Sequence, residues 1–347
     1  MIETKPVFAY RPQLDGLRFI CIIITIFNHV QGSPKWINGS TGVDIFFALS
    51  GFLITTLLVE EFQKNGSISI RAFYIRRICR IAPLYFLAVV VTAMAAFALA
   101  HVGEHEKLSE LSVAWPWILT FNREYCPVGC GTYFGHAWTI GIEEKFYILW
   151  PLIFAPLFRK DGVKWIAAFL VLISAVLFIC SDDPFKIRGY LGIIFGCLAG
   201  LWYFKFKREL GGAWLWTLVI FANYWLLGLL QWRYQNLLIS APSALLIISL
   251  VHRPTSRIAK LLGNPVTAFL GKLTYGIYLF HVLVINIVEM VLKSQKIDIP
   301  HNWAVVAGLG YGLTVCTAYL LYILVEKPAI QAGRAYSKSE PLAPKLQ

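Results

Sequence analysis

The stretch LDGLRFICIIITIFNHV, residues 14–30, has the composition of a membrane-spanning helix, yet it carries Arg18 near one end and His29 near the other. At 100° per residue, the eleven steps between them make three turns plus about 20°, so a helix places both side chains on one face. They then stand roughly 16 Å apart along the helix axis. Ionisable side chains cost about 2.5–3.5 kcal/mol inside a bilayer even on lenient scales, which makes them candidates for function. The pair predicts a line of polar contacts for an elongated ligand.

Apolar stretches of similar length recur along the whole chain. Of the 347 residues, 58% are hydrophobic and only 14% are charged, which is more apolar sequence than a soluble core of this size can bury. A helix needs about 20 residues to cross a bilayer, and the charge-poor stretches come close to that length. The sequence therefore predicts an all-α, polytopic membrane helix bundle with spans near residues 12–31, 41–59, 81–101, 138–158, 163–180, 189–204, 211–230, 234–251, 266–290 and 303–325.

A shorter apolar piece at residues 111–121 decides the topology. If it does not cross the membrane, the predicted cytoplasmic segments hold 20 Lys and Arg residues, the outer segments hold 8, and 3 lie within spans, which accounts for all 31. If it crosses, every later loop inverts and this bias disappears, contrary to the usual cytoplasmic excess of basic residues. We therefore expect about ten transmembrane helices with both termini cytoplasmic, and a re-entrant or interfacial position for residues 111–121.

The remaining segments suggest no second folded domain. Residues 1–330 are expected to form one integral-membrane domain and residues 331–347 a cytoplasmic tail, and no cleavable signal peptide is evident before the first span. The net charge of +12 could indicate a nucleic-acid partner, but cytoplasmic anchoring explains it better, and none is expected. Cys126 and Cys130 share a loop predicted to lie outside, where a disulfide and two free thiols are both plausible. No metal site is expected.

Three ionisable groups are predicted near the outer ends of their spans. His29 lies near the end of the first span, Asp44 enters the second from the same side, and Glu143 lies about one turn into the fourth. They meet at one depth if these spans are neighbours, and interface positions satisfied by water are the alternative. Small residues around Ser50 in the second span are explained by close helix packing, which does not explain Asp44.

The fourth span presents one carboxylate toward the bundle. Glu143, Tyr147 and Trp150 stand at i, i+4 and i+7 and share a helix face. Glu144 is rotated by about 100° from that face and can pair with Lys145 or with water. We therefore predict Glu143 as the inward carboxylate.

Basic residues gather in FYIRRICRIAPLY, residues 73–85. On a helix, Arg76 and Arg77 are i+4 and i+3 neighbours of Arg80. Such a cluster suits phosphate groups, because a guanidinium binds them bidentately. Positive-inside anchoring requires basic residues at the same place, and for this loop alone it is the better explanation.

Several further side chains are candidates for lining a cavity. They are polar or aromatic and lie within predicted spans: Ser50, Trp138, Tyr147, Tyr275 and His281. For His281, within TYGIYLFHVLV (residues 274–284), the sequence leaves two alternatives open, a core histidine and a cavity-lining one.

Taken together, these stretches resemble the membrane acyltransferase family three. The stretches that carry the resemblance are, in chain order, LDGLRFICIIITIFNHV, GVDIFFALSGFLIT, FYIRRICRIAPLY, HAWTIGIEEKFYILWP, TYGIYLFH and VEKP. The resemblance covers residues 14–328. It implies ten core helices in the cell inner membrane and transfer of an acyl group, often acetyl, from acyl-CoA as co-substrate, with no permanently bound cofactor. The acceptors it implies are usually sugar hydroxyls of surface polysaccharides, and sometimes lipid-linked precursors, antibiotics or peptidoglycan.

The resemblance also assigns roles. The family's motif residues fall on Arg18 and His29 for its Arg-x10-His pair, on Arg76, Arg77 and Arg80 for its cytoplasmic arginines, and on Glu143 for its fourth-span glutamate. The arginines are then expected to bind the phosphates of acyl-CoA. His29 is expected to be the general base, since an imidazole with a pKa near 6.5 is suited to take a proton from a hydroxyl. A carboxylate such as Asp44 or Glu143 could orient its ring.

The sequence departs from the family at identifiable positions. Phe19 stands where a small residue is usual, and Thr139 and Gly141 stand where serines are common, which excludes a hydroxyl role at position 141. The soluble esterase-like domain of many members is not in this sequence, which favours a single-step membrane enzyme. The alternative is a transporter or flippase of a glycan or lipid intermediate, because buried charges along a transmembrane line would serve that function too.

Overall fold

The fold is known from a computed structural model that describes residues 10–34, 39–127, 129–131, 133–158, 162–180, 184–206, 208, 210–230 and 237–339. Within these ranges every regular element is helical. The elements are α1 (Pro12–Phe27), α2 (Gly39–Asn65), α3 (Ile70–His101), α4 (Glu106–Leu119), η1 (Arg123–Tyr125), η2 (Gly135–Ala137), α5 (Trp138–Leu157), α6 (Gly162–Cys180), α7 (Pro184–Phe206), α8 (Ala213–Leu230), α9 (Leu237–His252), α10 (Arg257–Leu262), α11 (Pro265–Lys272), α12 (Thr274–Ser294), α13 (Trp303–Leu321), the π-helix η3 (Tyr322–Glu326) and α14 (Lys327–Ser339).

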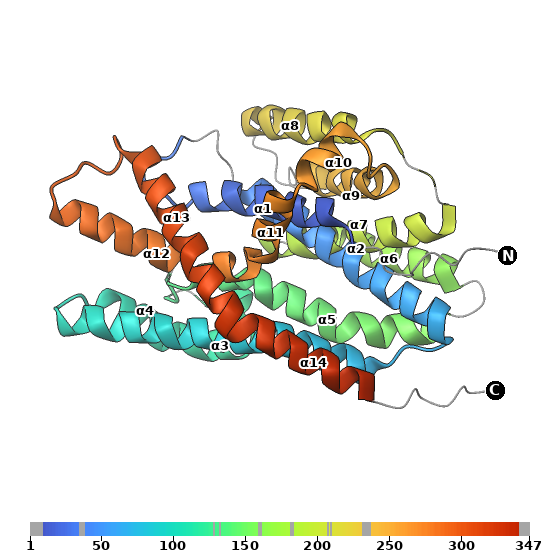
Figure 1. The fold of residues 1–347 in the computed structure, drawn as a ribbon, viewed down its shortest axis with the longest axis horizontal. Helices are drawn as coiled ribbons and strands as arrows, with labels where there is room; N and C mark the ends of the chain where they lie inside the picture. Colours follow the sequence, from blue (N-terminus) through green and yellow to red (C-terminus); the bar gives the residue numbers. More distant parts are fainter. Residues whose placement is uncertain are drawn as a thin grey trace.

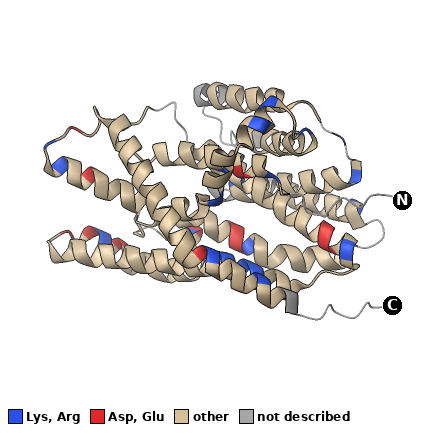
Figure 2. Cartoon of the chain, viewed as in Figure 1, with Lys and Arg blue, Asp and Glu red and all other residues tan. Residues whose placement is uncertain are grey.

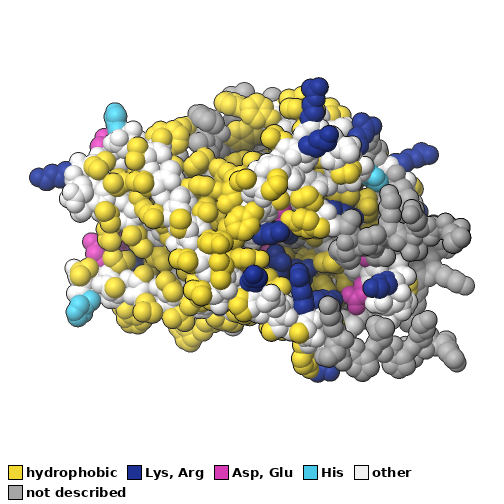
Figure 3. All heavy atoms as spheres, viewed as in Figure 1, with side chains coloured by type: hydrophobic (Ala, Val, Ile, Leu, Met, Phe, Trp, Pro, Cys, Tyr) yellow, Lys and Arg dark blue, Asp and Glu magenta, His cyan; other side chains and the backbone are white. Residues whose placement is uncertain are grey.

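The outer surface of the bundle is apolar, as a bilayer requires. Large side chains such as Met94, Leu172 and Leu324 are more than half exposed, and hydrophobic side chains cover most of the face in Figure 3. Among the described residues, five helical stretches are long and apolar enough to cross a membrane: α2, α3, Ile187–Phe206 of α7, α12 and the continuous helix Trp303–Ser337. The all-helical membrane fold is confirmed. The count of ten spans and the side on which each terminus lies stay predictions.

Helix α2 packs most extensively against α7 because both backbones are bare at the crossing. A Cβ on Gly51 would lie 2.0 Å from the carbonyl oxygen of Ile193, and a Cβ on Gly196 would lie 2.1 Å from that of Ala48. Small residues at such positions let transmembrane helices approach closely. Helix α1 lies against α2 as well as against α11 and α12, so the motif helices surround one interior region.

The two ends of the bundle are made by different turns. In Figure 1 the α2–α3 turn lies at the right, and the α3–α4 and α12–α13 turns lie at the left. Figure 2 shows that Lys, Arg, Asp and Glu occupy few positions along the helices, several of them in the interior. The α2–α3 end is the one predicted to be cytoplasmic, and the α3–α4 end is the one predicted to face outward.

Three helix boundaries differ from the sequence prediction. Helix α1 ends at Phe27, so His29 lies in the turn that follows it. Helix α7 begins at Pro184, which brings Arg188 into the helix. The predicted span 266–290 is broken into α11 and α12 at Leu273. There the amide of Leu273 donates to the Leu270 carbonyl at 3.1 Å, an i to i−3 bond that tightens the turn.

Two segments outside the predicted spans form helices. Helix α4 includes residues 111–119 of the short apolar piece and packs along α3. With 14 residues it spans about 21 Å, too short to cross a bilayer core of about 30 Å. At the other end of the chain, α14 continues to Ser339, so residues 331–339 of the predicted tail form a helix that packs against α3. A Cβ on Gly333 would lie 2.8 Å from the Cβ of Cys79, which shows how closely the two helices approach.

Candidate active site

Two cavities lie next to each other inside the bundle. The arginine cavity, named for Arg18, Arg77 and Arg80 in its wall, has a volume of about 110 Å³. The histidine cavity, named for His29 and His136 in its wall, has a volume of about 1210 Å³. Val43 and Tyr278 line both cavities. Arg18 of α1 and His29 in the turn after α1 therefore line two adjoining cavities.

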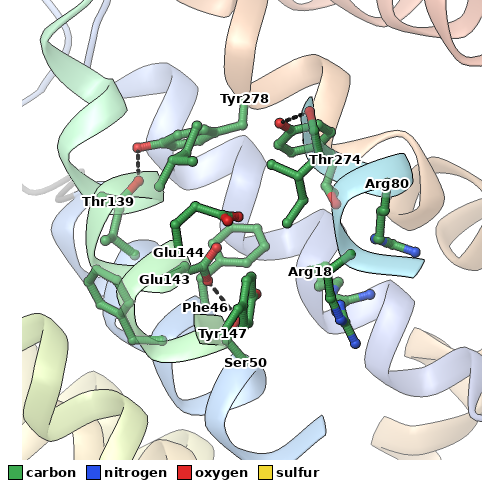
Figure 4. Close-up of a pocket in the computed structure, with 16 residues that line it drawn as sticks. Arg18, Phe46, Ser50, Arg80, Thr139, Glu143, Glu144, Tyr147, Thr274 and Tyr278 are labelled. Atoms are coloured by element: carbon green, nitrogen blue, oxygen red, sulfur yellow. Dashed lines mark hydrogen bonds between the residues drawn. The ribbon is translucent and has the colours of Figure 1, made fainter. Parts of the chain in front are cut away.

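The arginine cavity combines cations, carboxylates and hydroxyl groups. Figure 4 shows Arg18 and Arg80 on one side and Glu143 and Glu144 on the other. Arg18 pairs with Asp15 at 3.2 Å. The Arg77 guanidinium lies 5.2 Å from the ring centre of Tyr147, over the ring face. Such stacking fixes the direction of the side chain.

Glu143 is held by a short hydroxyl chain. The Ser50 hydroxyl donates to Glu143 Oε1, and the Tyr147 hydroxyl donates to Ser50 Oγ at 3.3 Å. All three residues line the arginine cavity, as does Tyr275, whose hydroxyl donates to the Ile81 carbonyl at 2.8 Å. Glu143 is thus oriented toward the arginines.

Two predictions about neighbouring charges differ from the structure. Glu144 lines the arginine cavity together with Glu143, although the helix rotation predicted that it would turn away. Lys145 does not pair with Glu144, because its Nζ lies 2.6 Å from Oε1 of Glu124 in the loop before α5. Arg76 pairs with Glu61 at 3.1 Å and is not in the wall of either cavity.

Gly141 has a packing role. A Cβ at this position would lie 2.6 Å from the carbonyl oxygen of Phe121 and 2.4 Å from Oε2 of Glu124. Lys145 Nζ bonds the Phe121 carbonyl at 2.8 Å and the Gly141 carbonyl at 3.3 Å. Glycine therefore lets the α4–α5 connection lie directly against α5, where a serine would collide with backbone.

The α4–α5 connection forms part of the wall of the histidine cavity. Of the two alternatives left open by the sequence, the structure has the disulfide between Cys126 and Cys130. Arg123 donates to the Gly131 carbonyl at 2.8 Å, and Glu110 accepts the Tyr133 amide at 2.9 Å. The first bond closes the connection on itself, and the second ties it to α4.

His29 opens onto the histidine cavity. Its side chain is exposed there, in the turn after α1. Trp138, Asn28 and Asn286 line the same cavity, together with Glu289, which accepts the Gln31 amide at 3.1 Å. An aromatic ring and amide groups around an exposed imidazole form a surface that can bind a polar, hydroxyl-bearing molecule.

Three histidines cluster beside this cavity. The His281 ring lies 4.9 Å from the His29 ring and 5.2 Å from the His136 ring, centre to centre, both edge to face. His281 is fully buried and is not in the wall of either cavity. Burial lowers the pKa of His136 to about 3, which keeps that ring neutral. Among the residues that the structure describes, no group of three or more His, Cys, Asp or Glu side chains is arranged to hold a metal ion.

Asp44 is held in a buried ion pair. Its carboxylate accepts from Nε of Arg188, and the same guanidinium donates to the Ser40 carbonyl. Asp44 is completely buried and Arg188 is 4% exposed. Arg188 was assigned to an outer loop by the sequence, and its burial in α7 is explained by the facing carboxylate, which compensates its charge.

Comparison with known proteins identifies the family of the chain. Residues 11–323 match the family model described as an acyltransferase domain. The chain belongs to this family. The acyltransferase is similar to "Putative O-acetyltransferase SAS0844" of Staphylococcus aureus, with 29% identity over 93% of this chain and 58% of the relative. It is also 30% identical to "Peptidoglycan O-acetyltransferase OatA" of Listeria monocytogenes, over 93% of this chain and 56% of the relative. The chain thus spans little more than half the length of these relatives. No solved structure matches it.

Five of the motif residues of the acyltransferase line the two adjoining cavities. Arg18, Arg77, Arg80 and Glu143 line the arginine cavity, and His29 lines the histidine cavity. The described hydrogen bonds of Asp44 and Glu143 go to Arg188 and Ser50, so neither carboxylate is seen to orient His29. That role stays a hypothesis for both.

Sequence reasoning missed three features of this site. Arg188 was counted as a loop cation, and only the facing Asp44 could have indicated that it is buried. His136 precedes α5 by two residues in a loop without apolar periodicity, so no pattern singled it out. The hydrogen bond between Tyr278 and Thr139, at 2.6 Å, joins residues 139 positions apart and left no local signal.

Proposed function

We propose that this acyltransferase moves an acyl group, most simply acetyl, from acyl-CoA to a hydroxyl of a cell-surface polysaccharide or of its lipid-linked precursor. The observation that carries the proposal is the pair of adjoining cavities, one lined by arginines and one by the exposed imidazole of His29. A donor with phosphates and an acceptor with a hydroxyl group require these two different environments. The membrane in which this occurs is proposed to be the cell inner membrane.

The arginine cavity suits the donor. Guanidinium groups bind phosphates bidentately, and Arg77 and Arg80 lie on the same helix near the α2–α3 end. The cavity is about eleven times smaller than its neighbour, so it suits a thin arm better than a nucleotide head. We infer that the phosphates of coenzyme A stay at the arginines while the pantetheine arm extends past Glu143 toward Tyr278.

The histidine cavity suits the acceptor. It is wide and contains Trp138, Asn28 and Asn286, side chains that can stack on a sugar ring and bond its hydroxyls. The relatives whose names mention peptidoglycan make a cell-wall glycan one such acceptor for testing.

In the proposed reaction His29 acts as general base. Its bare nitrogen takes the proton of the acceptor hydroxyl while the hydroxyl oxygen attacks the thioester carbonyl. The C–S bond then breaks, the acyl group stays on the acceptor oxygen, and the proton passes from the imidazolium to the leaving thiolate. General base catalysis of this kind contributes roughly 10²–10⁴-fold in rate.

The test uses the purified chain in lipid nanodiscs with acetyl-CoA and a soluble fragment of cell-wall glycan. Free thiol release and acetylated glycan, detected by mass spectrometry, report the two products. Wild type should form both in equal amounts, and His29→Ala should lose at least about 10²-fold in rate. His301→Ala is the matched control, because His301 lies in a loop and is 88% exposed.

Two outcomes would contradict the proposal. One is a wild-type chain that binds no acyl-CoA and transports a glycan lipid between leaflets, which would favour the flippase alternative. The other is full turnover by His29→Ala, which would remove the base assignment while leaving the enzyme class intact.

A further inference from the structure

The hydrogen bonding of His281 fixes which of its nitrogens carries the proton. His281 Nδ1 lies 2.7 Å from the carbonyl oxygen of Tyr278, which can only accept, so Nδ1 is the donor. A neutral imidazole has one N–H, and a charged one is costly in a membrane interior. Nε2 of His281 is therefore a bare acceptor. It is buried and has no hydrogen-bond partner in the protein.

A buried acceptor without a donor is unfavourable by about 1–3 kcal/mol, so the neighbours of His281 matter. His136 cannot supply the missing proton. Its Nε2 lies 3.2 Å from the Leu279 carbonyl and must donate there, which leaves its Nδ1 bare as well. The Tyr278 ring lies 5.6 Å from His281, but its hydroxyl donates to the His136 carbonyl. The remaining ring against His281 is that of His29, at 4.9 Å between centres and with an angle of 68° between the planes.

Asp44 and Glu143, the carboxylates predicted to orient His29, and Glu289 in the wall of the histidine cavity form hydrogen bonds with other groups. Asp44 bonds Arg188, Glu143 bonds Ser50, and Glu289 accepts the Gln31 amide. Among the described residues, the His29 ring is the closest ring to His281, and no hydrogen bond between the two is formed in this structure.

We propose that His281 is a positioning residue for His29: when the two edge-to-face rings close on each other by a small rotation, the bare nitrogen of His281 accepts the N–H of one His29 nitrogen and leaves the other nitrogen bare toward the histidine cavity. This inference rests on the proposed function, in which His29 is the base. It assigns to a neutral histidine the task that a carboxylate performs in a Ser-His-Asp triad. After proton transfer both His29 nitrogens carry hydrogen, one bonded to His281 and one free to protonate the leaving thiolate.

Two substitutions separate this role from simple packing. His281→Phe keeps a ring and removes the acceptor, whereas His281→Gln offers an amide oxygen near the position of Nε2. We expect His281→Phe to lower kcat roughly 10²-fold, within the range that a general base contributes, with an unchanged KM for acetyl-CoA. His281→Gln should recover most of that loss. His301→Phe is the matched control, since its ring is exposed in a loop.

A second measurement does not depend on turnover. Diethyl pyrocarbonate modifies bare imidazole nitrogens, and mass spectrometry of the digested protein measures the extent at His29. The fixed tautomer keeps the cavity-facing nitrogen bare, so His281→Phe should slow modification of His29 several-fold. His281→Gln and His301→Phe should leave the rate as in wild type.

The outcomes distinguish this inference from the proposed function. If wild type transfers no acyl group, the proposed function fails, and the modification rates of His29 still test the His281 contact. If wild type is active and His281→Phe matches it in kcat and in modification of His29, the inference is overturned. Equal losses in the Phe and Gln variants would indicate packing and would also overturn it. If His281→Phe does not assemble, a His281→Gln protein with near wild-type kcat and His29 modification supports the inference, and an inactive one overturns it.

Discussion

Tyr278 of α12 and Thr139 of α5 share a hydrogen bond of 2.6 Å at the boundary between the arginine and histidine cavities. The Tyr278 hydroxyl also donates to the His136 carbonyl at 2.7 Å, and Figure 4 shows the pair at the edge of the arginine cavity. A thioester that moves from one cavity toward the other must pass this point. We expect the same bonds to limit the access of water from the histidine cavity to the arginine cavity.

Removing the Tyr278 hydroxyl should therefore increase hydrolysis of the donor and decrease acyl transfer to the acceptor. We expect Tyr278→Phe to raise thiol release from acetyl-CoA several-fold when no acceptor is present, because water reaches the thioester more easily. Transfer to glycan should fall in the same variant. Tyr275→Phe is the control, since Tyr275 lines only the arginine cavity and bonds the Ile81 carbonyl. Equal hydrolysis in both variants would contradict a barrier at Tyr278.

The two adjacent glutamates should differ in their effect on turnover. Glu143 accepts from Ser50, whereas Glu144 Oε1 is buried without a hydrogen-bond partner. Glu143→Gln removes the charge that this hydroxyl chain orients toward Arg18 and Arg77, so we expect a loss of roughly 10²-fold or more in kcat. Glu144→Gln should stay within about tenfold of wild type, as expected for a group that the site does not hold in place. The reverse order in steady-state kinetics would transfer the catalytic assignment to Glu144.

The Asp44–Arg188 ion pair gives a prediction about stability. Asp44→Leu leaves a buried guanidinium without its carboxylate, and breaking such a pair costs about 3–5 kcal/mol. We expect a lower thermal unfolding midpoint in detergent and a lower yield of folded protein. The double variant Asp44→Leu with Arg188→Met should recover most of that loss, because it removes both charges.

The double variant also tests whether Asp44 takes part in the reaction. If the Asp44 carboxylate serves only to compensate the charge of Arg188, the folded double variant should transfer acyl groups at a rate within about tenfold of wild type. This is expected when no transition-state contact is lost. A stable but inactive double variant would assign Asp44 a direct role.

The sequence predicted the positions of the motif residues better than their partners. Apolar length and composition were sufficient for the all-helical membrane fold, and the spacing of Arg18 and His29 indicated two depths. The partners could not be predicted, because they come from helices distant in sequence. Asp44 meets Arg188 across 144 residues, and Glu143 meets Ser50 across 93.

Helical periodicity also predicted the directions of side chains incompletely in this tightly packed interior. The helical periodicity predicted that Glu144 points away from Glu143, yet both residues line the arginine cavity. From the sequence alone, the glycine at position 141 indicated only that a hydroxyl group is missing there. The structure adds that the backbone of Phe121 occupies the space a side chain would need.

The topology can be tested at turns that the structure exposes. Glu124, in the predicted outer loop, has a side chain only 2% exposed and is a poor labelling site. Glu104 in the α3–α4 turn and Gln63 near the end of α2 are exposed. In intact cells an impermeant maleimide should label Glu104→Cys but not Gln63→Cys, and lysis should expose the second. Labelling of Gln63→Cys in intact cells would invert the predicted orientation.

Two neighbouring arginines that the sequence could not distinguish differ in their position relative to the arginine cavity. Arg77 lines the cavity and stacks on Tyr147, whereas Arg76 pairs with Glu61 outside it. If the phosphates of coenzyme A bind at the cavity, Arg77→Gln should weaken acetyl-CoA binding by at least about tenfold, since a charge-assisted hydrogen bond contributes about 1.5–3 kcal/mol. Arg76→Gln, which removes the same charge from the same helix turn, should change the affinity by less than about fivefold, because an exposed ion pair is worth at most about 1 kcal/mol. Calorimetry in nanodiscs at two salt concentrations measures both, and His29→Ala should bind like wild type. Equal weakening by Arg76→Gln and Arg77→Gln would mean that the arginines act through general surface charge, and the donor site would then lie outside this cavity.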